Sequence, residues 1–120
     1  MRLLLVEDES QLREIMADEL REGGWHVTEA ETGDEAIQLL ERRGDFDIVI
    51  TDVRMPGAAD GIEVAMRALQ GSPRIPVLLV SGFAPGLANR LSALAPPCAF
   101  ILKPFKFAQL WQAVRKLLAA

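Results

Sequence analysis

The sequence contains one cysteine, Cys98, among 120 residues, so an internal disulfide is excluded and the chain fits a reducing compartment. Because Cys98 has no cationic or histidine neighbour in sequence, we expect it to be a small buried hydrophobe rather than a reactive thiol. Basic residues are outnumbered by acids: the formal net charge is -4, and no cationic block occurs. Direct binding to nucleic acid or to an anionic membrane surface is therefore disfavoured.

Long apolar runs are absent as well. The run at the amino terminus, Leu3–Val6, is too short for a signal-peptide core, and three acids (residues 7–9) follow it at once. Since no segment is long enough to cross a bilayer, we expect a cytoplasmic protein without membrane contact. The sequence also lacks linkers, repeats and low-complexity tracts, which indicates a single domain over residues 1–120.

What the sequence does contain is a series of short apolar runs. Such runs, without polar alternation, are typical of strands buried on both faces of a parallel sheet. A further, weaker run at residues 25–30 alternates apolar with polar residues. In chain order, the expected strands are Leu3–Val6, Trp25–Ala30, Ile48–Ile50, Val77–Val80 and Ala99–Leu102.

Segments of helical periodicity separate these strands. Thr32 and Asp60 each open a capping box, so helices should start directly after them. Glycines should end the first three helices, at Gly23-Gly24, Gly44 and Gly71.

The Ala- and Leu-rich residues 84–95 suggest a fourth helix, with Pro85 in its first turn, and an apolar stripe from Phe107 to Leu117 marks the last. Five strand–helix repeats predict an α/β fold, with helices on both faces of a doubly wound parallel sheet. We expect the flavodoxin-like (βα)5 arrangement, with strand order 2-1-3-4-5.

Polar side chains follow four of the five expected strands. Glu7 and Asp8 follow the first, Asp52 the third, Ser81 the fourth and Lys103 the fifth. Each has an ordinary explanation alone: a turn residue, a helix cap or a solvated charge. In the order 2-1-3-4-5, however, these strands are neighbours, so the set converges where open parallel sheets bind ligands.

The combination of these residue types points to phosphoryl chemistry. Three crowded carboxylates are costly to ionise unless a cation joins them, and oxygen ligands of this kind suit Mg²⁺. The Asp52 carboxylate can act as a nucleophile, since carboxylates form aspartyl phosphates. The Lys103 ammonium and the Ser81 hydroxyl would cover phosphoryl oxygens that the ion leaves free.

Four motifs, in this order and spacing, resemble the receiver domains of two-component response regulators. They are LLVEDE at residues 4–9, TDVRMPG at 51–57, VSG at 80–82 and LKPF at 102–105. The resemblance spans essentially the whole chain. It implies a signalling module, which takes a phosphoryl group onto Asp52 from a histidine kinase or a histidine phosphotransfer protein. It does not imply an enzyme that acts on a small-molecule substrate.

The resemblance also implies roles for the other residues. Glu7, Asp8, Asp52 and the backbone carbonyl of Arg54 would hold Mg²⁺, with Mn²⁺ as the alternative ion. Ser81 matches the switch hydroxyl of the family, Phe100 its switch aromatic, and Lys103 its active-site lysine. The Lys103–Pro104 bond is expected to be cis.

The sequence departs from the usual family pattern in three places. Glu7 stands where an aspartate is common, and its extra methylene still lets it reach a metal-bound water. The loop Gly57–Gly61 is one residue longer than usual, a feature shared with receivers of hybrid histidine kinases. The chain also ends after the fifth helix, so we expect no output domain.

Three further residues should tune the lifetime of the phosphoryl group. Arg54 lies two positions beyond Asp52, Phe83 lies two beyond Ser81, and Gly82 leaves the path beside the hydroxyl open.

A downstream protein is expected to dock on the face formed by residues 84–95, strand 99–102 and the last helix. Because Arg90 is the only charge in residues 84–95, we expect a monomer or a weak dimer rather than a dimer built on charge pairs.

Three other functions remain as alternatives. A phosphatase with an aspartyl nucleophile usually needs a second acid where Arg54 stands. A flavin-binding electron carrier of the same fold would need a phosphate-binding loop where three acids occur at residues 7–9, and these would repel a phosphate. A protein-interaction module that works without phosphorylation would leave the complete acceptor set unexplained.

Overall fold

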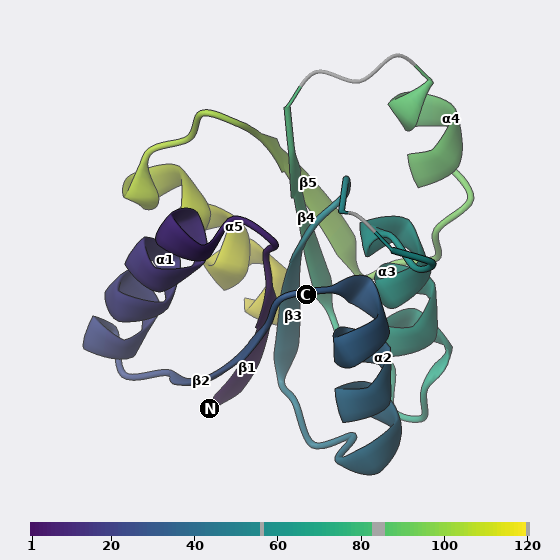
Figure 1. Cartoon of the computed structure of the whole chain (residues 1–120), viewed down its shortest axis with the longest axis horizontal. Helices are drawn as coiled ribbons and strands as arrows, with labels where there is room; N and C mark the ends of the chain where they lie inside the picture. The colour runs from purple at the N-terminus through teal and green to yellow at the C-terminus, as the bar shows by residue number, and fades with distance from the viewer. Residues whose placement is uncertain (56, 83–85, 120) are drawn as a thin grey trace.

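Five parallel strands form one sheet in the computed structural model, which describes residues 1–55, 57–82 and 86–119 (Figure 1). The strands are β1 (Arg2–Val6), β2 (His26–Ala30), β3 (Ile48–Asp52), β4 (Val77–Ser81) and β5 (Cys98–Leu102). Their order is β2-β1-β3-β4-β5, which confirms the predicted flavodoxin-like topology. Every residue of β3 and β4 is buried, whereas the edge strands β2 and β5 are largely half-buried.

Helices cover both faces of the sheet. They are α1 (Ser10–Glu22), α2 (Gly33–Arg42), α3 (Gly61–Gln70), α4 (Leu87–Leu91) and α5 (Phe107–Ala119). Figure 1 shows α1 and α5 together on one face, and α2 and α3 on the other. Each face has its own buried cluster, centred on Leu5, Leu20 and Leu110 under α1 and α5, and on Val49, Val64 and Leu79 under α2 and α3. No helix in the described part of the chain is long and apolar enough to cross a membrane.

The predicted helix starts are confirmed by their caps. The Thr32 hydroxyl accepts a hydrogen bond from the Glu35 N–H at 3.1 Å, and α2 begins at the next residue, Gly33. The Asp60 carboxylate accepts bonds from the N–H groups of Ile62 and Glu63, at 3.0 and 3.1 Å. Side-chain caps of this kind satisfy N–H groups that have no partner inside the helix.

The expected fourth helix over residues 84–95 is wrong in its extent. In the described residues α4 covers only Leu87–Leu91, and Ala84 and Pro85 lie outside the described part. Beyond Leu91 the backbone hydrogen bonds span three residues instead of the four of an α-helix. One of them runs from the Leu94 N–H to the Leu91 carbonyl, at 3.0 Å. The Ser92 hydroxyl also donates to the Asn89 carbonyl, at 2.8 Å, and such local bonds compete with regular helix.

β5 begins at Cys98, which is half-buried and packs against the cluster under α2 and α3. Burial raises the pKa of its thiol, in agreement with the expected apolar role. The Lys103–Pro104 bond that follows β5 is cis, as predicted.

The start of α3 lies directly against the end of β3. The N–H of Gly61 donates to the Val53 carbonyl at 2.9 Å. A Cβ added to Gly61 would stand only 1.8 Å from the backbone oxygen of Asp52, so no larger residue fits without a shift of backbone. Gly61 therefore allows α3 to support the strand end that carries Asp52.

We predict that Gly61→Ala lowers the free energy of unfolding by about 1–3 kcal/mol or more, because the added methyl group overpacks against backbone. Urea denaturation measures the loss. Gly82→Ala is the matched control, since a Cβ there meets no atom within 4 Å in the described part of the chain. Equal stability of the two variants would contradict the close approach of α3 to β3.

Candidate functional site

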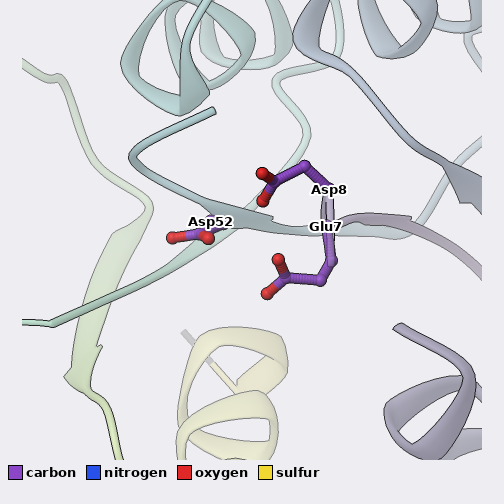
Figure 2. Close-up of side chains that lie close together, drawn as sticks. All are labelled: Glu7, Asp8 and Asp52. Atoms are coloured by element: carbon purple, nitrogen blue, oxygen red, sulfur yellow. The ribbon is translucent and has the colours of Figure 1, made fainter. Parts of the chain in front are cut away.

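Three acidic side chains meet at the carboxyl ends of β1 and β3. Glu7 and Asp8 follow β1, and Asp52 is the last residue of β3. The two strands pair with Val6 opposite Thr51, so Glu7 and Asp52 continue neighbouring strands at the same level. Figure 2 shows the three carboxylates turned toward one another, and one oxygen from each lies within 4.8 Å of the others. Glu7 and Asp52 are buried, with 3% and 8% of their surface exposed, whereas Asp8 is open to solvent.

Lys103, which follows β5, reaches across to two of these acids. Its Nζ lies 3.0 Å from Glu7 Oε1 and 3.0 Å from Asp52 Oδ2. The backbone N–H of Lys103 donates to the Ser81 carbonyl at 2.8 Å, which ties the start of the loop after β5 to the end of β4. One ammonium, on the residue after β5, therefore links the carboxyl ends of β1 and β3.

The site carries more negative than positive charge. Burial raises the pKa of the Glu7 carboxyl, and the Asp52 charge adds to that rise, while hydrogen bonds from Lys103 and from the Glu9 N–H oppose it. Burial alone would lower the pKa of Lys103, but its bonds to Glu7 and Asp52 outweigh that effect, and the net pKa is raised. Lys103 is thus held firmly in its charged form.

Ser81 and Phe100 lie on the neighbouring strands. Ser81 ends β4 and is 2% exposed; its Cα pairs with Leu102, the residue before Lys103. Phe100 is half-buried on β5, packs against the cluster under α2 and α3, and lines a pocket together with Leu91 of α4. The hydroxyl and the aromatic ring thus belong to two adjacent strands of the site.

The residues expected to tune the phosphoryl lifetime are placed only in part. Arg54 is exposed, two residues beyond Asp52, and Gly82 is half-buried with open space at its Cα in the described part of the chain. Phe83 lies outside the described residues, as does Pro56 of the motif after β3.

The loop after β3 rests on two other elements. Ala59 is buried, and its carbonyl oxygen would lie 2.3 Å from a Cβ added at Gly33, so the loop packs tightly on the start of α2. Asp60, besides capping α3, pairs with Arg90 of α4 at 2.6 Å. The sequence did not predict this pair, because only the fold brings α4 beside the start of α3.

The donor set fits a hard divalent cation. All three acids offer oxygen, the atom that Mg²⁺ prefers, and the crowding of their charges is relieved by a cation. Lys103 supplies one positive charge to the two buried acids, which leaves the exposed Asp8 without an ion-pair partner among the described residues.

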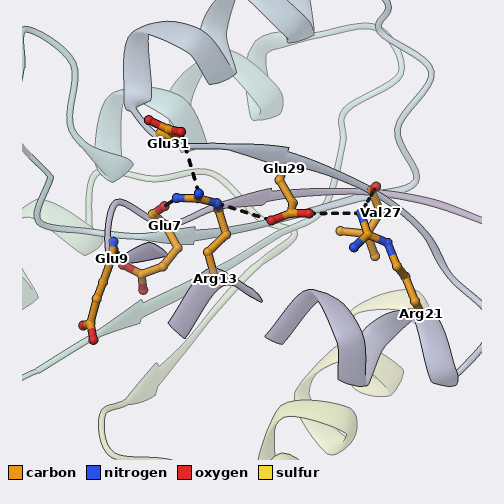
Figure 3. Close-up of polar contacts among 7 residues, drawn as sticks. All are labelled: Glu7, Glu9, Arg13, Arg21, Val27, Glu29 and Glu31. Atoms are coloured by element: carbon orange, nitrogen blue, oxygen red, sulfur yellow. Dashed lines mark hydrogen bonds and ion pairs between the residues drawn. The ribbon is translucent and has the colours of Figure 1, made fainter. Parts of the chain in front are cut away.

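Sequence reasoning missed Arg13 on α1. Its Nη1 donates to the backbone carbonyl of Glu7 at 3.0 Å, and its Nε lies 3.3 Å from Glu29 on β2 (Figure 3). Arg13 carries no motif signal, because the contact depends on how α1 folds back over the end of β1.

We predict that Lys103→Met lowers the free energy of unfolding by roughly 1–3 kcal/mol near pH 8, because the buried carboxylates lose their charged donor. The substitution raises the pKa of Glu7 further. A carboxyl whose pKa is higher in the folded than in the unfolded state lowers stability at pH values above its unfolded-state pKa. This destabilisation decreases as the pH falls and the carboxyl takes up a proton. The loss of stability in Lys103→Met should therefore be smaller at about pH 5 than near pH 8.

Urea denaturation of the wild type and Lys103→Met at the two pH values measures this difference. Lys106→Met, at an exposed position three residues further along, is the control. A loss that is the same at both pH values would contradict the role of Lys103 as the charge partner of Glu7.

Comparison with known proteins agrees with this architecture. The family model for the response regulator receiver domain matches residues 3–115. The chain is 33% identical over 119 residues to the response regulator receiver protein CpdR of Brucella abortus (strain 2308), which covers 99% of this chain and 98% of that protein. It is 36% identical over 120 residues to the chemotaxis protein CheY-3 of Vibrio cholerae, covering 98% and 91%.

A solved structure gives the same result in three dimensions. The response regulator receiver protein from Sinorhizobium medicae WSM419 superposes with a TM-score of 0.90 at 34% identity, covering 100% of this chain and 95% of that one. Phosphorylation and Mg²⁺ binding at an acidic pocket are standard for this family, and in this chain Glu7, Asp8 and Asp52 form an acidic cluster. The chain therefore belongs to the response regulator receiver domain family of two-component signalling.

Proposed function

We propose that this chain is a phosphoacceptor that takes a phosphoryl group onto Asp52 from the phosphohistidine of a histidine kinase or a histidine phosphotransfer protein. The observation that carries the proposal is the ammonium of Lys103, 3.0 Å from both Asp52 and Glu7, beside the three-carboxylate cluster. Family membership supports it, since receiver domains interact with such partners.

The reaction asks for a positioned nucleophile and neutralised charge. The Asp52 carboxylate attacks phosphorus, the phosphorus–nitrogen bond to the partner histidine breaks, and an aspartyl phosphate forms. Asp52 ends the fully buried strand β3, and its backbone is backed by Gly61 of α3, so the nucleophile sits on a rigid support. A fixed carboxylate lowers the entropic cost of reaching the in-line geometry.

A divalent metal fits the same residues. Glu7, Asp8, Asp52 and the backbone carbonyl of Arg54 would hold Mg²⁺, or Mn²⁺, which would balance the charge of the acids and of the incoming phosphoryl oxygens. Glu7 is buried and already oriented by hydrogen bonds from Lys103 and from the Glu9 N–H. At the end of β1, the Glu7 carboxylate is therefore already fixed in its orientation before an ion binds.

The remaining site residues would convert phosphorylation into a binding signal. The Lys103 ammonium would move from two carboxylates to a phosphoryl oxygen, and the Ser81 hydroxyl would take another oxygen. Phe100 lies on the strand next to Ser81 and lines a pocket together with Leu91 of α4, so a shift at Ser81 would be passed to α4 through this ring. We propose that a downstream protein docks on the face of α4, β5 and α5, and that the chain acts as a monomer or weak dimer.

The lifetime of the phosphoryl group would be set by its neighbours. Arg54, Gly82 and Phe83 flank the nucleophile and the hydroxyl in sequence. We propose that the chain loses its phosphoryl group by its own slow hydrolysis and has no turnover on a small-molecule substrate.

We predict that incubation with acetyl phosphate and Mg²⁺ adds one phosphoryl group to the protein, measured as intact mass. Asp52→Asn should remove the adduct, because an amide is not a nucleophile of this kind, and chelation of Mg²⁺ throughout should suppress it. An adduct that survives Asp52→Asn would contradict the assignment of the nucleophile. An adduct that forms without Mg²⁺ would contradict the role of Glu7 and Asp8.

We also predict that Mg²⁺ raises the thermal midpoint of unfolding, since an ion that binds only the folded state stabilises it by about 2.7 kcal/mol at about a hundredfold excess over its Kd. Differential scanning calorimetry with and without Mg²⁺ measures the shift. Asp8→Asn should reduce the shift without removing the Lys103 pairs, which involve Glu7 and Asp52 alone. An undiminished shift in Asp8→Asn would place the ion elsewhere.

A further inference from the structure

Arg13 holds the backbone of the acidic loop, residues 7–9, from outside the carboxylate cluster. Its guanidinium donates through Nη1 to the Glu7 carbonyl at 3.0 Å, and the side chain is only 14% exposed. The backbone N–H of Arg13 also bonds to the Glu9 carbonyl, at 2.9 Å. The guanidinium therefore binds the acidic loop at Glu7 (Figure 3). The bond to Glu9 is the regular backbone bond that starts α1 and does not depend on the side chain.

The carbonyl that Arg13 binds belongs to the peptide unit joining Glu7 to Asp8. That unit is planar, so fixing its carbonyl also fixes the direction of the Asp8 N–H and the start of the Asp8 residue. On its other side, Glu7 is held by the bond from its own N–H to the Ala30 carbonyl at 3.1 Å. The backbone of Glu7 is thus fixed by β2 through its N–H and by Arg13 through its carbonyl.

Two glutamates, one on β2 and one directly after it, hold the guanidinium in this position. Arg13 Nε lies 3.3 Å from Glu29 Oε1, and its Nη2 lies 3.7 Å from Glu31 Oε1. These two partners balance its charge and use the fork geometry that only arginine offers. Among the described residues, Arg13 makes no ion pair with the carboxylates of Glu7, Asp8 or Asp52, so it acts on the loop through the backbone.

We propose that Arg13 is a positioning residue for the metal site: it fixes the Glu7–Asp8 peptide so that both carboxylates are presented together. This inference rests on the proposed function, in which the two acids bind Mg²⁺. Groups that orient metal ligands without touching the ion commonly change metal affinity by about tenfold or more when they are replaced.

Arg21 provides a matched control on the same helix. Its Nη2 lies 3.1 Å from Glu29 Oε2 and donates to the Val27 carbonyl at 3.0 Å, so it too pairs with Glu29 and with a backbone carbonyl of β2 (Figure 3). It has no hydrogen bond or ion pair with residues 7–9 in the described part of the chain. A general role in stability would be shared by both arginines, whereas positioning of the acidic loop belongs to Arg13.

The test compares the wild type with Arg13→Gln, Arg13→Lys and Arg21→Gln by isothermal titration with Mg²⁺ alone. We expect Arg13→Gln to weaken Mg²⁺ binding by about tenfold, and Arg21→Gln to leave it unchanged. Arg13→Lys keeps the charge but not the fork, and we expect its binding to be weakened as well. Thermal unfolding of each variant checks that all are folded at the titration temperature.

A second readout needs no metal. The Glu9 N–H donates to Glu7 Oε2 at 3.1 Å, and we expect its hydrogen exchange in metal-free protein to speed up in Arg13→Gln and not in Arg21→Gln. Unchanged exchange at Glu9 would overturn the inference, as would equal losses of Mg²⁺ affinity in Arg13→Gln and Arg21→Gln. If the wild type binds no Mg²⁺ while exchange at Glu9 responds to Arg13→Gln alone, the proposed function fails and the positioning role stands.

Discussion

The site is organised by one ammonium shared between two buried carboxylates. Glu7 and Asp52 are almost fully removed from water, and carboxylates so placed repel each other and lose hydration. Lys103 offsets part of this cost, at 3.0 Å from each acid, and its backbone is tied to β4. Because the compensation is incomplete, the pocket suits a divalent cation, which would also offset the negative charge of an incoming phosphoryl group.

The fold supplies what this arrangement needs, which is rigidity at the ends of particular strands. β3 is buried along its whole length, and Gly61 lets α3 approach the carbonyl of Asp52 more closely than a side chain would allow. Arg13 holds the other half of the pocket, at the end of β1. The loop after β3 is anchored as well, through Ala59 on α2 and Asp60 on α4, and the Asp60–Arg90 pair joins α4 to the segment after the nucleophile.

Much of this could be predicted from sequence because it depends on local patterns. Apolar runs gave the strands, capping residues gave two helix starts, and the strand order then brought Glu7, Asp52 and Lys103 to one edge. Contacts that depend on how helices pack could not be predicted: Arg13 with Glu7, and Arg90 with Asp60, join segments whose spacing is unrelated to any motif. The predicted extent of α4 was also wrong. The hydrogen bond from the Ser92 hydroxyl to the Asn89 carbonyl, which competes with regular helix, cannot be predicted from composition.

The central claim is that Asp52, one of the two carboxylates bridged by Lys103, receives the phosphoryl group. Borohydride reduces an acyl phosphate to an alcohol, which marks the modified residue permanently for peptide mapping. After phosphorylation of the wild type with acetyl phosphate and Mg²⁺, the account predicts homoserine at position 52 and at no other acidic residue. Reduction at Glu7 or Asp8, or a phosphorylated protein with no reducible acyl phosphate, would contradict it.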